Sequence, residues 1–474
     1  MKRNRNHMKK ILLLTTALGL VGASSLTAAT VDVFITGSTA FRANVYNAAK
    51  AMYTSTPNIY YADAAHGGAN GAGTAKTAGW TMTGTPLASL TALSGDTLVI
   101  HGLFTGSVQG LQTTEQGTKL VFAAPSLTAT DNQNADTYVT NVPTIGFSDA
   151  SASSTPYPVP GNFLEEQVCV QPFVWCTSRA ASGGVTEVTN ITWEQVEYGL
   201  PVGRIPLASW TFQVGDTNKF VYLLQRTKDS GTRRTETQGA YYSYSGTATM
   251  PTYMYDVTNH AVYTPSVLTN YASGIATNGG AGVIGTEGPG LGNANMGWGF
   301  GYIGGGDIAT ALGDTSANDQ CISYLSIGDS QKVNGSVFWQ TVISYNGIWP
   351  TAAGPGIHGN PGVTNDFSPI TLGYYPLWGF EILVHPENTS TPGSTISGQD
   401  LTYGQLGDNT QPASTGSFMS IFNAQSFNNG NVATVGSIEN DIILSQPAGA
   451  TAITLAAMSN SRPNVGGTIY PAFQ

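Results

Sequence analysis

Charged side chains are scarce in this chain. Only 10% of its 474 residues are Asp, Glu, Lys or Arg, against roughly 25% in an average soluble domain. A disordered chain combines low hydrophobicity with high net charge, whereas 41% of this chain is hydrophobic, so we expect it to fold. Nucleic-acid binding needs basic stripes, and here 18 Lys and Arg stand against 28 Asp and Glu. The composition predicts a folded protein with a neutral, polar exterior that binds no nucleic acid.

Cysteine is also rare, with only Cys169, Cys176 and Cys321 present. An odd number leaves at least one thiol unpaired in an exported protein. Cys169 and Cys176 are near enough in sequence to bridge a short turn, and the alternative is that all three are buried thiols. No His lies at ligand spacing from them, so we expect no metal site and no cofactor.

Long apolar runs are missing as well, and none reaches the roughly 20 residues that span a bilayer. The apolar run at 11–21 follows five basic residues and precedes small residues, with Thr27 and Ala29 placed as in a cleavage site. This layout predicts a signal peptide over 1–29 and a periplasmic or extracellular protein. No Cys lies near the cut, so no lipid anchor is expected, and cleavage would make the chain more acidic.

Strand and helix patterns alternate along the remaining chain. The β-branched segment 31–36 predicts a strand, and the apolar spacing from Phe41 to Met52 predicts an amphipathic helix. Further strands are expected at 97–104, 142–151, 166–178, 220–226, 322–328 and 378–384. Alternation of this kind indicates α/β layers.

Other segments give weaker patterns. Thr192 and Gln195 form a capping box that begins a helix, which we expect Gly199 to end. A second helix is expected at 336–343. The Gly-rich segment 63–95 indicates a loop or hairpin insertion, 151–161 a linker, and 239–320 an insertion with little regular structure.

Three turns rich in Gly, Ser and Thr stand between a predicted strand and a predicted helix, at 37–39, 105–107 and 230–232. A helix N-terminus offers unpaired N–H groups and partial positive charge, which together bind anions. Ser and Thr are also ordinary N-caps, so one such turn is weak evidence. Three of them would share a ligand if they lie at strand carboxyl ends.

Five short segments resemble, in the same order, the phosphate-binding proteins of ABC transporters, which are type II periplasmic binding proteins. The segments are ITGSTAF (35–41), IGFSDA (145–150), RTKDSGTR (226–233), YNGIWPT (345–351) and GYYPL (373–377). The resemblance implies a two-lobed α/β fold with a central cleft, here carrying Gly-rich insertions. It implies lobe one at 30–158 and 345–474, lobe two at 159–344, and closure of the lobes around the ligand.

The same resemblance implies a phosphate site built from helix N-termini, hydroxyls, one Arg and one Asp. Asp149 would accept the proton of hydrogen phosphate and repel sulfate, which has none. Arg226 would add a charge-assisted contact. Asp229, Ala40 and Arg42 depart from the family pattern. The implied ligand-binding residues are Thr39, Phe41, Thr105, Ser107, Asp149, Arg226, Ser230, Gly231 and Thr232.

These observations predict a secreted solute-binding protein for phosphate or a similar oxyanion, with an ABC permease as its partner. The alternative is an extracellular structural or adhesive protein that keeps the fold without transport binding, suggested by the segment 239–320. An enzyme is not expected, because no His forms a sequence motif with Ser230 or with a carboxylate.

Overall fold

The computed structural model describes most of the segments with predicted strands and helices. The described residues are 28–63, 78–104, 106–126, 133–157, 160, 163–178, 188–227, 230–240, 250, 253, 255–256, 260–262, 301–302, 304–316, 319–330, 332–333, 341–351, 367–387, 406, 418, 460–461 and 470–471. Within them, no helix is long and apolar enough to cross a membrane. The signal peptide expected at 1–29 lies almost wholly outside them.

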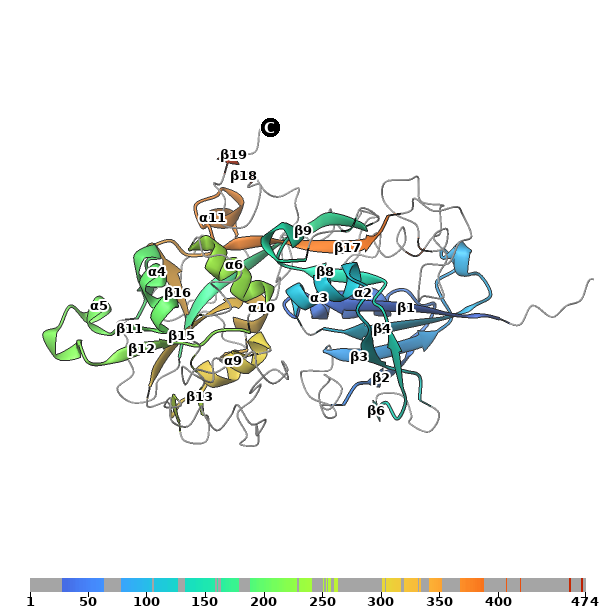
Figure 1. The fold of residues 1–474 in the computed structure, drawn as a ribbon, viewed down its shortest axis with the longest axis horizontal. Helices are drawn as coiled ribbons and strands as arrows, with labels where there is room; N and C mark the ends of the chain where they lie inside the picture. Colours follow the sequence, from blue (N-terminus) through green and yellow to red (C-terminus); the bar gives the residue numbers. More distant parts are fainter. Residues whose placement is uncertain are drawn as a thin grey trace, which may run out of the picture.

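A single mixed sheet of 13 strands runs through the molecule. Its two long strands, β9 (Phe163–Thr177) and β17 (Trp378–Pro386), pair antiparallel and join a lobe on either side (Figure 1). Both strands are buried over most of their length and rich in Val, Ile, Phe and Trp, which suits a central position. The predicted two-lobed α/β class is confirmed.

The first lobe is built on three parallel neighbours, β8 (Ile145–Ser148), β1 (Thr30–Gly37) and β4 (Thr97–Leu103). Helix α2 (Arg42–Lys50) follows β1, and α3 (Ser107–Glu115) follows β4. The sheet continues through β3 (Gly79–Gly84), β2 (Asn58–Tyr61) and β6 (Gln133–Asn134). The segment 63–95, expected to be a loop or hairpin insertion, contributes β3, which pairs antiparallel with β2 and β4 and buries Trp80 and Met82 as a full member of the sheet.

The second lobe continues the sheet on the other side of β9. Its strands are β15 (Gln320–Ser326), β12 (Phe220–Leu223) and β11 (Arg204–Pro206), with β16 (Val342–Tyr345) and β10 (Asn190–Ile191) branching from β9. Its helices are α4 (Trp193–Val202), α5 (Ala208–Thr211), α6 (Gly231–Gly239), α9 (Gly305–Leu312), α10 (Ile327–Ser330) and α11 (Ser368–Thr371). Outside the main sheet lie β5 (Leu120–Ala123) with β7 (Tyr138–Asn141), β13 (Tyr255–Asp256) with β14 (Ala261–Val262), and β18 (Asn460–Ser461) with β19 (Tyr470–Pro471).

Each lobe has its own apolar core, and the chain passes between the cores within β9 and β17. Cys169 belongs to the first core and Val170 to the second, while Trp378 belongs to the second and Leu383 to the first. Residues 345–378, which we assigned to lobe one, contribute Tyr345, Ile370 and Trp378 to the second core. The second crossover of the chain between the lobes therefore lies within β17, where Trp378 packs in the second core and Leu383 in the first, and not before residue 345.

Three local expectations also need correction. Helix α4 has the predicted capping box, but it continues past the buried Gly199 to Val202 and ends at Gly203, whose φ of 73° suits glycine. A helix was expected at 336–343, but Val342 and Ile343 belong to strand β16 and pair with β9. Residues 336–340 lie outside the described part. The segment 239–320 contains α9, two turns of regular helix.

All three cysteines are free and buried. Cys169 and Cys176 lie in the single strand β9, where seven residues span roughly 23 Å at about 3.3 Å per residue. A bridge between them is therefore sterically impossible, and the alternative of buried thiols is correct.

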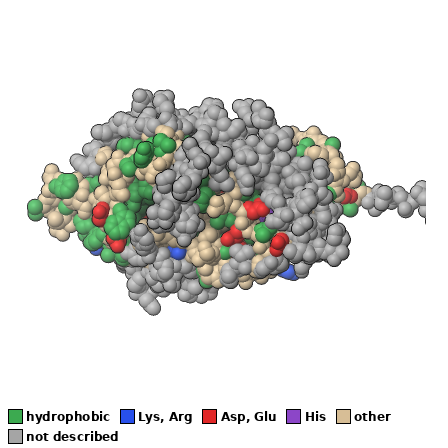
Figure 2. Space-filling view, turned by 90° about the horizontal axis from the view of Figure 1, so that it is seen from above, with side chains coloured by type: hydrophobic (Ala, Val, Ile, Leu, Met, Phe, Trp, Pro, Cys, Tyr) green, Lys and Arg blue, Asp and Glu red, His purple; other side chains and the backbone are tan. Residues whose placement is uncertain are grey.

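The surface agrees with the composition. Figure 2 shows one face on which few of the described side chains are those of Asp, Glu, Lys or Arg. Some large apolar side chains are exposed on the second lobe, with Phe212 and Val214 beside α5 and Leu372 and Tyr374 after α11.

Gly37 ends β1 and allows the next turn to lie against β8. Its φ is +125°, and a Cβ there would lie 1.9 Å from the Phe147 carbonyl oxygen. This position requires glycine for both conformation and space.

We expect Gly37→Ala to lower the free energy of unfolding by at least about 3 kcal/mol, since backbone strain and a backbone clash add. Gly95 is the matched control, because its φ is +89° but a Cβ there would have no described atom within 4 Å. Gly95→Ala should lose only about 1 kcal/mol. Urea unfolding measures both, and equal losses would show that the contact with Phe147 is unimportant.

Candidate functional site

The carboxyl ends of β8, β1 and β4 meet at one edge of the first lobe. The Ser38 N–H donates to the Phe147 carbonyl (2.8 Å), and the Gly106 N–H donates to the Gly37 carbonyl (3.1 Å). Helices α2 and α3 begin directly after these turns. The second lobe brings the N-terminus of α6 to the same place, where Gly231 approaches Asp149 and Ser107. The three turns singled out in the sequence therefore converge.

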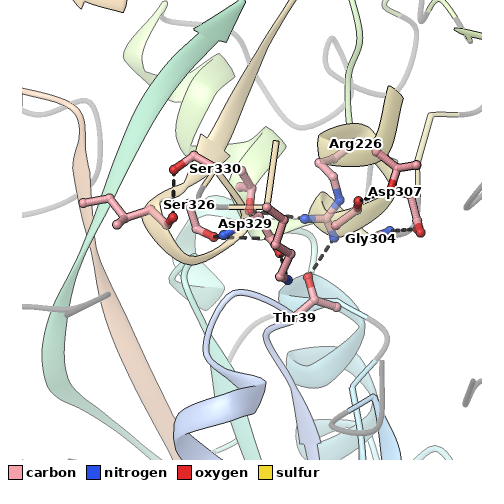
Figure 3. A network of polar contacts seen from close by, with 12 residues as sticks. Thr39, Arg226, Gly304, Asp307, Ser326, Asp329 and Ser330 are labelled. Carbon is pink, nitrogen blue, oxygen red and sulfur yellow. Dashed lines mark hydrogen bonds and ion pairs between the residues drawn. The ribbon is translucent and has the colours of Figure 1, made fainter. Parts of the chain in front are cut away.

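Arg226 links the two lobes at this junction. Its side chain is 2% exposed, and its Nη2 donates to the Thr39 hydroxyl oxygen across the lobes at 2.9 Å (Figure 3). Its Nε donates to the Tyr302 carbonyl at 3.1 Å, and its Nη1 lies 3.5 Å from the Thr232 hydroxyl oxygen. Burial lowers the pKa of Arg226, while the charges of Asp329 and Asp149 oppose that shift.

Asp149 is the carboxylate of the junction, and it is 1% exposed. It follows β8 directly and accepts hydrogen bonds from the Ser107 hydroxyl and, at 3.3 Å, from the Thr232 hydroxyl. Burial raises the pKa of Asp149, and the Ser107 hydrogen bond and the Arg226 charge act against the increase. The carboxylate thus receives donors from both lobes.

Gly231, the first residue of α6, lies against this carboxylate. A Cβ on Gly231 would lie 1.5 Å from Asp149 Oδ1 and 2.6 Å from Ser107 Cβ. The helix N-terminus reaches Asp149 only because residue 231 has no side chain.

The remaining sequence-predicted residues divide into three groups. Ser230 is the N-cap of α6, and its hydroxyl oxygen accepts from the Arg233 N–H at 3.4 Å, as an ordinary cap does. The Phe41 side chain is fully buried against Phe147, so only its backbone belongs to the turn. Thr105 and Asp229 lie outside the described residues.

Two acidic residues near Arg226 had no signal in the sequence. Asp307 in the first turn of α9 accepts from the Gly304 N–H at 3.2 Å, and burial raises its pKa against the charge of Arg226. Asp329 of α10 is buried and lies 2.6 Å from Lys332 Nζ. Although burial alone would raise it, the charges of Lys332 and Arg42 hold the pKa of Asp329 below its usual range. Figure 3 shows both carboxylates on the second-lobe side of Arg226.

The junction brings hydrogen-bond donors from both lobes to the carboxylate of Asp149. The hydroxyls of Ser107 and Thr232 contact the carboxylate of Asp149, the Arg226 guanidinium contacts Thr39 and Thr232, and helices α2, α3 and α6 begin beside these groups. Donors of this kind suit an anion, and the carboxylate suits one that carries a proton. Within the described residues, no group of His, Cys, Asp and Glu is arranged to hold a metal ion.

No family model and no curated protein matches the sequence. Solved structures are similar in outline. They include a phosphate-bound putative phosphate ABC transporter substrate-binding protein from Clostridium perfringens (11% identity, TM-score 0.38, covering 76% of this chain and 88% of the other). An ABC-type phosphate transport receptor from Vibrio cholerae has 13% identity, TM-score 0.35 and the same coverages, and a phosphate-binding protein from Stenotrophomonas maltophilia has 12%, 0.30, 75% and 78%. At TM-scores this low, what those proteins bind does not transfer to this chain by similarity.

We expect Gly231→Ala to lower the free energy of unfolding by about 1–3 kcal/mol, because the methyl group forces α6 away from Asp149. Gly239 at the other end of α6 is the matched control, since a Cβ there would have no described atom within 4 Å. Gly239→Ala should change stability by no more than about 1 kcal/mol. Thermal or urea unfolding compares the two, and a neutral Gly231→Ala would contradict the close approach.

Proposed function

We propose that this chain is an exported solute-binding protein that binds phosphate or a similar oxyanion between its two lobes. The observation that carries the proposal is a chain of contacts across the lobes, in which Arg226 contacts Thr39 and Thr232, and Thr232 donates to Asp149. These groups come from both lobes, so an anion that replaced Thr39 and Thr232 as the partner of Arg226 would hold the lobes together.

Short-range contacts must provide the binding energy. The chain carries a formal net charge of −10, so its overall field repels an anion. Backbone N–H groups at helix N-termini, hydroxyls and a buried guanidinium act over a few ångströms, and they act more strongly away from water. The buried position of Arg226 and Thr232 meets that requirement.

Asp149 supports the choice of a protonated oxyanion. Ionised Asp149 can accept the proton that hydrogen phosphate still carries, whereas sulfate has no proton to donate and is repelled. A buried carboxylate makes this difference large because the repulsion is poorly screened.

We also propose that the chain acts in the periplasm or outside the cell, that it delivers its ligand to an ABC permease, and that it catalyses no reaction. The signal-peptide layout of 1–29 supports export. Within the described residues, the junction around Arg226 contains hydrogen-bond donors but no His beside a hydroxyl, which supports binding over catalysis.

Inorganic phosphate should raise the melting temperature saturably, and sulfate should raise it little. At 100 times the dissociation constant, the gain in unfolding free energy is about 2.7 kcal/mol. A thermal-shift titration with both salts at equal ionic strength tests the proposal. Equal responses would contradict the discrimination, and no response would contradict oxyanion binding.

Asp149→Asn should narrow the phosphate-to-sulfate affinity ratio by about tenfold or more, equivalent to about 1.4 kcal/mol, because the amide no longer repels sulfate. Asp216→Asn is the control, since Asp216 pairs with Lys219 far from the junction. Calorimetric titration of each variant with both anions measures the ratio. An unchanged ratio in Asp149→Asn would remove Asp149 from this role.

A second candidate is the structural or adhesive extracellular protein. One observation favours it: Arg226 and Asp149 are already paired with protein groups in the structure. If these contacts serve only to fix the lobes, no oxyanion will compete for them, and the titrations above will be flat.

A further inference from the structure

Another carboxyl group, that of Glu381, lies next to Asp149 in β17, the strand that joins the two lobes. Its side chain is fully buried, and neither of its oxygens has a hydrogen-bond partner among the described residues. An ionised carboxylate without partners in such a place costs several kcal/mol, so the neutral acid is the favoured form.

The sheet register places Glu381 beside Asp149. In the pairing of β17 with β8, Ile382 lies opposite Ser148, so Glu381 and Asp149 occupy the next position along the ladder. Glu381 also lies opposite Cys169 of β9, immediately before a register shift. Bulges re-aim side chains, and this shift directly follows the residue that lies opposite Asp149 in the ladder.

The electrostatics agree with this geometry. Burial raises the pKa of Glu381 well above its usual range, and the charge of Asp149 raises it further. The Ser38 hydroxyl lowers this pKa in part, although the two side chains do not reach hydrogen-bond geometry and the Ser38 hydroxyl is itself buried without a partner in the described part of the chain. Two carboxyls this close cannot both ionise without a large penalty.

Other titratable groups packed against β17 are accounted for. The Cys169 thiol faces Glu381 from β9, and burial raises its pKa, so it is neutral. Glu115 on α3 interacts with Glu165 instead. Farther along the ladder, Glu166 lies 3.6 Å from His385. Asp149 is therefore the charged group that Glu381 faces.

We propose that Glu381 is a positioning residue that holds a proton beneath the oxyanion junction, so that Asp149 is the ionised member of the pair. Loss of that proton puts a second negative charge behind the junction and weakens oxyanion binding. The coupling rests on the proposed function, and it makes release of the anion sensitive to alkaline pH.

The test compares wild type, Glu381→Gln and Glu115→Gln by calorimetric titration with inorganic phosphate at about pH 8 and about pH 10, where phosphate itself keeps one proton. We expect wild type and Glu381→Gln to bind alike at pH 8. As the pH rises toward 10, wild type should weaken relative to Glu381→Gln, and the ratio of the two affinities should change by about tenfold or more once Glu381 has lost its proton. Glu115→Gln is the matched control, because burial and Glu165 raise the pKa of Glu115 to about 8, but Glu115 lies at the opposite end of α3 from Ser107 and Asp149. This variant should lose affinity with rising pH as wild type does. Equal pH dependence in wild type and Glu381→Gln would overturn the proposal.

Thermal unfolding without phosphate gives an independent readout. Because the native state keeps a proton that the unfolded state releases, Glu381 destabilises the fold increasingly as the pH rises above the ordinary Glu range. The melting temperature of Glu381→Gln minus that of wild type should therefore increase by at least about 3 °C from pH 5 to pH 9. A difference that stays constant with pH would overturn the proposal. Should the Gln variant not fold, Glu381→Met removes the titration with an apolar side chain. If wild type binds no phosphate at either pH, the proposed function fails, and the unfolding comparison still decides whether Glu381 carries a proton.

Discussion

The antiparallel ladder between β9 and β17 is the constraint on which the rest of the structure depends. It is the part of the sheet shared by both lobes, and the chain changes from one apolar core to the other within it. Because β8, β1 and β4 are stacked on one side of this ladder and β15 and β12 on the other, their following helices point toward a common junction. The contact between Arg226 and Thr39 across the lobes follows from that layout.

A chain poor in charge places several of its ionisable groups in this one region. Arg226, Asp149, Asp329 and Glu381 are all almost fully buried. Each is made tolerable in a different way: Arg226 by backbone and hydroxyl acceptors, Asp149 by donors from both lobes, Asp329 by nearby cations, and Glu381 by remaining protonated. The chain is therefore poor in charge overall but has several buried ionisable groups at the junction. These groups act at short range and contribute little to long-range steering.

Much of the framework could be predicted from local pattern. The strands β1, β4, β9, β12, β15 and β17 and the helices α2, α4 and α6 carry the periodicity or capping residues of their class. The convergence of Ser107, Asp149, Gly231 and Thr232 was accessible only through turn chemistry and family resemblance. Asp307, Asp329 and Glu381 could not be found, because their roles come from long-range packing that leaves no periodic signature. The prediction that Gly199 ends α4 was wrong for a related reason. Glycine at this position allows close packing against Ile205 and does not end the helix. The helix predicted to include Val342 and Ile343 was wrong because a short apolar run fits either a helix or a buried strand, and only the pairing with β9 decides between them.

The register break in the β9–β17 ladder divides this connection mechanically. Trp378 to Glu381 pair with β9 in one register and Ile382 to Pro386 in another, with Val168 as the extra residue. Since a bulge bends a strand and increases its local twist, this break sets the angle between the two halves of the ladder. The break lies within one residue of the change of core, so each lobe contains about one half of the ladder. Lengthening or removing this one-residue irregularity would alter the angle between the lobes while leaving every group at the junction attached to its own lobe.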